Sequence, residues 1–173
     1  TGDSVLTSED SLIEFEVNVP ESGLYNLSVV YYSVEGKNSD IERSIFIDGE
    51  LPFQEMALLT FPRVWINYVE NTYYDENGIL IKEWEKDNQG NDVKPKTMEA
   101  PEWQSRYCYD SDGYVTEPLP IYLEAGEHTI SMVSVKEPML INKLVLDSEG
   151  VIASYEEVMA AWNAAGAEDT IGN

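Results

Sequence analysis

The sequence is poor in positive charge. Its 173 residues include 10 Lys and Arg against 33 Asp and Glu, a net charge of -23 with histidine neutral. A chain of this charge repels nucleic-acid phosphates and anionic membrane surfaces. We therefore expect no nucleic-acid partner. The acidity is compatible with solubility, with cation binding or with a neutral ligand such as a sugar.

Cysteine and long apolar runs are also scarce. Cys108 is the single cysteine, so no internal disulfide can form, and we expect a small, mostly buried side chain. No apolar run is long enough to span a membrane, and no signal peptide is recognisable. We therefore expect no direct membrane insertion by this chain.

The residues and motifs of common catalytic sites are missing. The single histidine, His128, opens a predicted strand, and we interpret it as structural or exposed rather than as a general base. No Gly-x-Ser-x-Gly, Walker, His-Glu-x-x-His or Rossmann glycine pattern occurs. The carboxylates allow a glycosidase pair, but nothing singles out two of them. The sequence thus predicts a domain that is not an enzyme, with a glycoside hydrolase fragment as the less favoured alternative.

What the sequence does contain is a series of short strand patterns. Apolar and polar residues alternate over Leu12–Val19, and turn residues ending at Gly23 lead to a second apolar run over 24–33, which together predict a hairpin. Further strands are predicted at 41–47, 119–123, 128–135 and 139–146. Short strands separated by turns favour an all-β, antiparallel sandwich of the jelly-roll kind over residues 1–150.

One helix is predicted after the last strand. Ser154 is a candidate N-cap, Glu157 completes a capping box, and Gly166 supplies a stop. We expect residues 151–173 to hold this helix and the start of a linker.

Residues 62–118 are predicted to be an insertion rich in aromatic residues. It carries nine of the 15 Trp and Tyr residues among turn-forming Gly, Asn, Asp and Pro. Aromatic ring faces match the C–H faces of sugars, and amides and carboxylates match sugar hydroxyls. The alternative is that the rings form a small core beneath a long loop. The candidate ligand-binding residues are Trp65, Trp103, Tyr107 and Trp84, with Arg63 and Asp110 as polar partners.

Three acidic turns lie inside the insertion. Asn77-Gly78 predicts the type I′ turn of a hairpin over 73–84. Residues 87–92 and 110–113 offer closely spaced oxygen ligands of the kind that bind calcium. The same residue types are common turn formers, however, and the EF-hand pattern is incomplete. We predict structural turns and no cofactor, with calcium as the alternative.

Three segments together resemble a known group of domains. Residues 15–27 are similar to the strand–Pro-Glu-x-Gly-x-Tyr–strand segment of galactose-binding-like jelly rolls, which include carbohydrate-binding modules of families 6 and 35. Residues 45–50 resemble their Asp-Gly segment, and residues 121–130 resemble their Leu-x-Ala-Gly-x-His-Thr-Ile strand pair. The resemblance implies a non-catalytic carbohydrate-binding-like module with an oligosaccharide or polysaccharide ligand. It also places Trp65 near the loop tryptophan that stacks on sugar.

A more specific resemblance is to accessory domains of extracellular solute-binding lipoproteins from bacterial sugar ABC transporters. It is carried by Phe61-x-Arg63-x-Trp65 and by Asp110-x-x-Gly113-Tyr114. It implies a secreted or cell-surface bacterial protein with neighbouring domains. The chain departs from the sugar-binding pattern at residues 140–142, where an Asn-Leu-Asp segment is usual, and the family's first strand is not recognisable. A structural spacer or protein-interaction sandwich without sugar binding is therefore the alternative.

Overall fold

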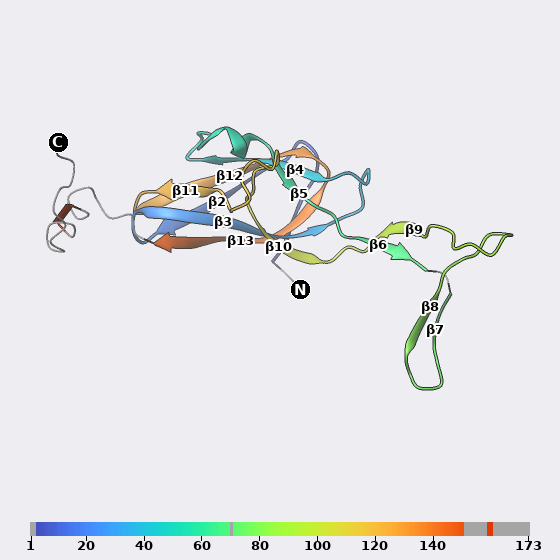
Figure 1. Ribbon diagram of the computed structural model, residues 1–173. Helices are drawn as coiled ribbons and strands as arrows, with labels where there is room; N and C mark the ends of the chain where they lie inside the picture. The colour runs from blue at the N-terminus through green and yellow to red at the C-terminus, as the bar shows by residue number, and fades with distance from the viewer. Residues whose placement is uncertain (1–2, 70, 151–158, 161–173) are drawn as a thin grey trace, which may run out of the picture.

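The structure is an antiparallel β-sandwich from which a long arm projects (Figure 1). The computed structural model describes residues 3–69, 71–150 and 159–160. It confirms the expected all-β, antiparallel architecture. The helix predicted over 154–166 lies outside the described residues apart from Met159 and Ala160, so it stays a prediction.

The first sheet has five strands. They run in the order β1-β13-β3-β10, and β11 also pairs with β3, beyond the end of β10. Their bounds are Val5–Thr7 (β1), Met139–Gly150 (β13), Gly23–Ser33 (β3), Trp103–Tyr107 (β10) and Pro120–Leu123 (β11). The short strand β1 was not predicted from the sequence.

The second sheet has four strands in the order β2-β12-β4-β5, again all antiparallel. Their bounds are Leu12–Val19 (β2), Gly126–Lys136 (β12), Ile41–Ile47 (β4) and Leu59–Phe61 (β5), and the 3-10 helix η1 spans Gln54–Ala57.

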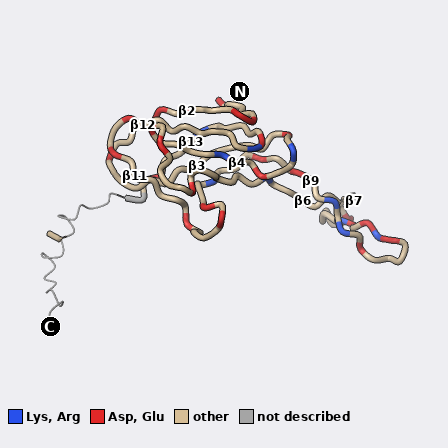
Figure 2. The backbone as a smooth tube through the Cα atoms, turned by 90° about the horizontal axis from the view of Figure 1, so that it is seen from above, with Lys and Arg blue, Asp and Glu red and all other residues tan. Residues whose placement is uncertain are grey.

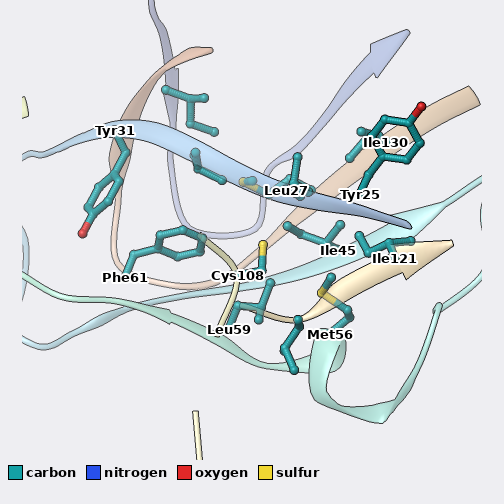
Figure 3. Packing of buried hydrophobic residues seen from close by; sticks show 14 of the residues in the cluster. Tyr25, Leu27, Tyr31, Ile45, Met56, Leu59, Phe61, Cys108, Ile121 and Ile130 are labelled. Carbon is teal, nitrogen blue, oxygen red and sulfur yellow. The ribbon is translucent and has the colours of Figure 1, made fainter. Parts of the chain in front are cut away.

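The core lies between the two sheets (Figure 3). Alternate residues of β3, among them Leu27 and Tyr31, point inward with no exposed surface and meet Ile45 and Ile130 from the second sheet. Cys108 is buried in the same cluster, as the sequence predicts. This continuous apolar layer holds the two sheets face to face and leaves their other faces to the solvent.

The hairpin predicted over residues 12–33 is wrong. β2 pairs with β12 in the second sheet, whereas β3 pairs with β13, β10 and β11 in the first. The turn at Pro20-Glu21-Ser22 therefore crosses from one sheet to the other, and the Tyr25 hydroxyl donates to the Glu21 carbonyl beside it at 2.7 Å. Alternation of apolar residues predicts a strand but carries no information about its partner.

The insertion divides into a projecting part and a part that returns to the sandwich. Residues 64–69 and 71–99, here called the arm, form two ribbons that extend from one end of the sandwich in Figure 1, and β10 then joins the first sheet. The first ribbon pairs β6 (Trp65–Tyr68) with β9 (Lys96–Glu99), and the second pairs β7 (Asn71–Tyr74) with β8 (Leu80–Glu83).

The hairpin of the second ribbon is confirmed, but its predicted type I′ turn is wrong. Type I′ requires a positive φ at both central residues. Gly78 has φ 76°, whereas Asn77 is not among the residues with positive φ. Asp75 organises the turn instead, because its Oδ1 accepts bonds from the backbone N–H groups of Asn77 and Ile79.

Candidate functional site

Two aromatic rings lie side by side on the outer face of the five-stranded sheet. Trp103 on β10 lies directly opposite Tyr32 on β3. Their ring centroids are 5.5 Å apart with a 52° tilt, and Trp103 is 48% exposed. Neighbouring residues of a strand point to opposite faces, and Tyr31 points into the core. Tyr32 and Trp103 therefore form a two-ring platform toward the solvent.

The platform continues across the sheet as an apolar row. Leu140 on β13 lies opposite Tyr32, and Leu6 on β1 lies opposite Leu140. Leu6 is exposed and Leu140 is half-buried. The apolar row (Leu6, Leu140, Tyr32 and Trp103) thus spans four adjacent strands. A row of this length suits an extended ligand better than a small, enclosed one.

Polar groups lie beside the platform on the same face. Tyr107 follows Trp103 by four residues on β10, so both side chains point outward. The Tyr107 hydroxyl donates a 2.7 Å hydrogen bond to Asp147 Oδ2, which raises the pKa of Tyr107. Asp147 on β13 is exposed and was not singled out from the sequence. Its only sequence signal was its place on an outward-facing strand position.

The predicted aromatic residues do not all come together. Trp65 is 42% exposed and lies opposite Glu99 in the first ribbon, at the root of the arm. Trp84 is 43% exposed and lines a hollow within the arm together with Tyr68 and Pro95. The structure therefore groups Trp103 with Tyr107 on the sandwich and places Trp84 elsewhere.

Arg63 does not reach the ligand face. Its side chain has no exposed surface. Nε donates to Ser39 O, Nη1 to Val34 O and to Glu99 Oε1, and Nη2 to Glu137 Oε2, at 2.7–2.8 Å. These bonds join the root of the arm to the loops of the sandwich, so Arg63 acts as a structural link.

Asp110 and Asp87 are occupied by their own turns. Asp110 accepts hydrogen bonds from the backbone N–H groups of Asp112, Tyr114 and Val115, and the bond from Asp112 contributes most to lowering the pKa of Asp110. Asp87 accepts bonds from the N–H groups of the turn that it opens. This is the geometry of Asx turns. Within the described residues, no group of three or more His, Cys, Asp or Glu side chains is placed to hold a metal ion.

His128 has the contacts of a structural residue. Nδ1 lies 2.7 Å from Asp48 Oδ2, and Nε2 lies 2.8 Å from the carbonyl oxygen of Glu124. Because both ring nitrogens face acceptors, only the doubly protonated imidazolium satisfies both. The bond to Asp48 is the main cause of the raised pKa of His128.

Comparison with known proteins yields similarity to solved structures only. No family profile matches the chain, and no curated protein sequence does. A native family 35 carbohydrate binding module from Clostridium thermocellum aligns at 13% identity with a TM-score of 0.44, covering 84% of this chain and 92% of that one. A second family 35 module from Clostridium thermocellum aligns at 16% identity with a TM-score of 0.37, covering 85% of this chain and 89% of that one.

A β-glucosidase from Paenibacillus barengoltzii aligns at 14% identity with a TM-score of 0.38. The alignment covers 84% of this chain but 10% of the enzyme. No helix in the described part of the chain has the length and apolarity needed to cross a membrane.

Proposed function

We propose that this domain is a non-catalytic carbohydrate-binding module that holds a polysaccharide against the outer face of its five-stranded sheet. The observation that supports this most is the platform formed by the exposed Trp103 and the half-buried Tyr32. Aromatic ring faces stack on the C–H faces of pyranose rings. Beside them, Tyr107 and Asp147 offer groups that can donate to or accept from sugar hydroxyls.

The ligand that this face fits is an extended, neutral glycan. The apolar row crosses four strands, so successive sugar units can lie along it. The net charge of -23 disfavours acidic polysaccharides. Because the platform is open to water, affinity per site is expected to be weak.

Trp65 is proposed as a flanking contact. The strand that carries it leaves the sandwich beside the segment leading to Trp103, since the Ala100 N–H donates to the Val64 carbonyl at 2.9 Å. A glycan longer than the platform could therefore continue toward the root of the arm. The sequence resemblance instead predicts Trp65 as the main stacking ring; here Trp103 takes that place and Trp65 flanks it.

The test is a calorimetric titration with a panel of neutral polysaccharides. Trp103→Ala is expected to weaken binding about tenfold, because a stacked ring contributes on the order of 1.5 kcal/mol. Trp65→Ala should have a smaller effect. Trp84→Ala is the matched control, since Trp84 is equally exposed but lies in the arm. Equal affinities for wild type and Trp103→Ala would contradict the proposed site, and hydrolysis of a bound glycan would contradict the non-catalytic role.

The resemblance in sequence also supports a specific setting. We infer that the domain belongs to a secreted or cell-surface bacterial protein, as an accessory domain of a sugar-transport solute-binding protein. An antibody against this domain should then detect the parent protein in the surface or culture fraction of the bacterium. Detection in the cytoplasmic fraction alone would contradict this setting.

A structural spacer is the second candidate function. The buried contacts of Arg63, which tie the arm to the sandwich, favour it because they give the arm a defined position. A spacer would bind no member of the glycan panel, and its Trp103→Ala variant would be indistinguishable from the wild type.

A further inference from the structure

The arm carries a large share of the exposed apolar side chains. Of 20 large hydrophobic residues that are exposed in the described part of the chain, ten belong to the arm, which is about a fifth of the sequence. They are Trp65, Ile66, Tyr68, Tyr73, Tyr74, Ile79, Leu80, Trp84, Val93 and Met98. Exposed apolar side chains that gather in this way mark surfaces that bind another protein.

The arm has no layer of its own to cover these side chains. It consists of two separate two-stranded ribbons, and both project beyond the sandwich in Figure 1. A two-stranded ribbon alone is at best marginally stable in water. A second layer packed on the ribbons would bury the apolar side chains and stabilise them.

In the first ribbon, the strand register places Lys96 and Glu99 on opposite faces. Residues directly opposite each other share a face, and so do residues two apart on one strand. Lys96 lies opposite Tyr68 and therefore shares a face with Ile66. Glu99 lies opposite Trp65 on the other face. The ribbon thus has one face with lysine and one with glutamate, but Glu99 is already paired with the buried Arg63 at 2.8 Å and its side chain is 14% exposed. The first ribbon therefore offers a partner its lysine face, which carries Lys96 and Ile66.

The second ribbon is arranged in the same way. Lys82 lies opposite Thr72 and shares its face with the pair Tyr74 and Leu80. The other face holds Tyr73, whose hydroxyl donates to Glu83 at 2.9 Å. Figure 2 shows blue and red segments along the same arm. Within the described residues, neither Lys82 nor Lys96 forms an ion pair.

An apolar face with an unpaired lysine is complementary to an apolar face with a glutamate, and the arm presents both kinds. We propose that the arm is an interface between two copies of this chain, in which the lysine face of the first ribbon of one arm packs on the glutamate face of the second ribbon of the other, so that Lys96 meets Glu83. Because each arm contributes one face of each kind, from different ribbons, the same contact is made twice, once in each direction, as a two-fold symmetric dimer requires. The inference is independent of glycan binding, because it uses no residue of the platform.

The large negative charge of the chain opposes the association of two copies. Two chains of charge -23 repel each other. An arm-to-arm contact keeps the acidic sandwiches apart, and at physiological ionic strength charges separated by more than about 8 Å are largely screened.

Sedimentation velocity of the full chain over a concentration series at physiological ionic strength tests the proposal. The wild type is expected to form a dimer as concentration rises. Ile66→Asp should raise the dissociation constant about tenfold or more, because it removes an apolar contact and places a carboxylate on the face that packs against the partner's glutamate face. Leu12→Asp is the matched control on the sandwich, where Leu12 is more open to solvent than Ile66, and should change nothing.

Reversing the charges of lysine and glutamate residues on the arm tests whether these side chains meet across the interface. The variants Lys96→Glu and Glu83→Lys should each associate more weakly than the wild type. An equimolar mixture of the two should associate again, because each then supplies the charge that the other lacks. The unfolding transition of each variant shows whether the sandwich remains folded. A wild type that stays monomeric, a dimer that Ile66→Asp leaves unchanged, or a mixture without recovery would overturn the proposal.

Discussion

Arg63 Nη2 and Glu137 Oε2 lie 2.8 Å apart, and neither side chain has any exposed surface. Glu137 sits between β12 and β13 with φ 63°, a left-handed conformation that is unfavourable for its type. Its carboxylate also accepts bonds from the Lys37 N–H and the Ser39 hydroxyl. The pair therefore fixes the loop around residue 37 to the loop at residue 137.

Removing one partner of this pair should destabilise the domain strongly. Arg63→Ala leaves the carboxylate of Glu137 buried without its cation, and breaking a buried pair costs roughly 3–5 kcal/mol. Chemical denaturation measures the loss. Lys136→Ala is the control, since its contact with Glu42 is 3.6 Å long and lies at the surface; it should cost less than about 1 kcal/mol. Equal losses in the two variants would contradict this account.

The carboxylate of Glu137 should make the unfolding free energy depend on pH in the acid range. Burial acts to raise the pKa of Glu137, but hydrogen bonds from Ser39 and the Lys37 N–H, together with Arg63, outweigh it and lower the pKa. A lowered pKa stabilises the fold above the ordinary value near 4.5, and this contribution is lost as pH falls through the lower folded value. The unfolding free energy of wild type and Glu137→Gln should therefore differ at neutral pH and converge in acid. A difference independent of pH would contradict the assignment.

His128 should make the stability of the fold depend on pH in the opposite direction. Its pKa is raised, chiefly by the bond to Asp48, so the imidazolium stabilises the fold below about pH 6.5 and the benefit disappears as pH rises through the folded value. His128→Gln should lower stability in mild acid but much less above neutrality. The difference is expected to stay below about 1 kcal/mol, because Asp48 is half exposed and solvent screens the pair. A titration of the histidine by NMR would check the direction of the shift independently.

The strands were predictable where the information is local. Apolar alternation and turn residues identify β2, β3, β4 and β12, since these signals lie within the strand itself. The choice of partner is not local. β2 and β3 follow each other in sequence but belong to different sheets, because each buries its inner face against the other sheet.

The candidate site, too, was predictable only where the signal lies within one segment of the sequence. Trp103 was predicted as a ligand contact because it lies in the aromatic-rich insertion among turn-forming residues. Its neighbour Tyr32 was not predicted, because the register between β3 and β10 decides which residues meet. Arg63 was predicted as a polar partner of the ligand. Its two acidic partners, Glu99 and Glu137, are distant in sequence, so burial of the ion pairs could not be foreseen.

Cys108 should report on unfolding. The thiol is 1% exposed, and burial raises its pKa to about 12, so the thiolate that reacts with disulfide reagents is scarce in the folded domain. We expect no measurable reaction in mildly alkaline buffer until denaturant unfolds the sandwich, and a reaction midpoint that coincides with the loss of tryptophan signal. Ser105→Cys is the matched control, because residue 105 lies on the exposed face of β10 and its thiol should react at once. Fast modification of Cys108 under native conditions would mean that β10 separates from β3 and opens the core beside it.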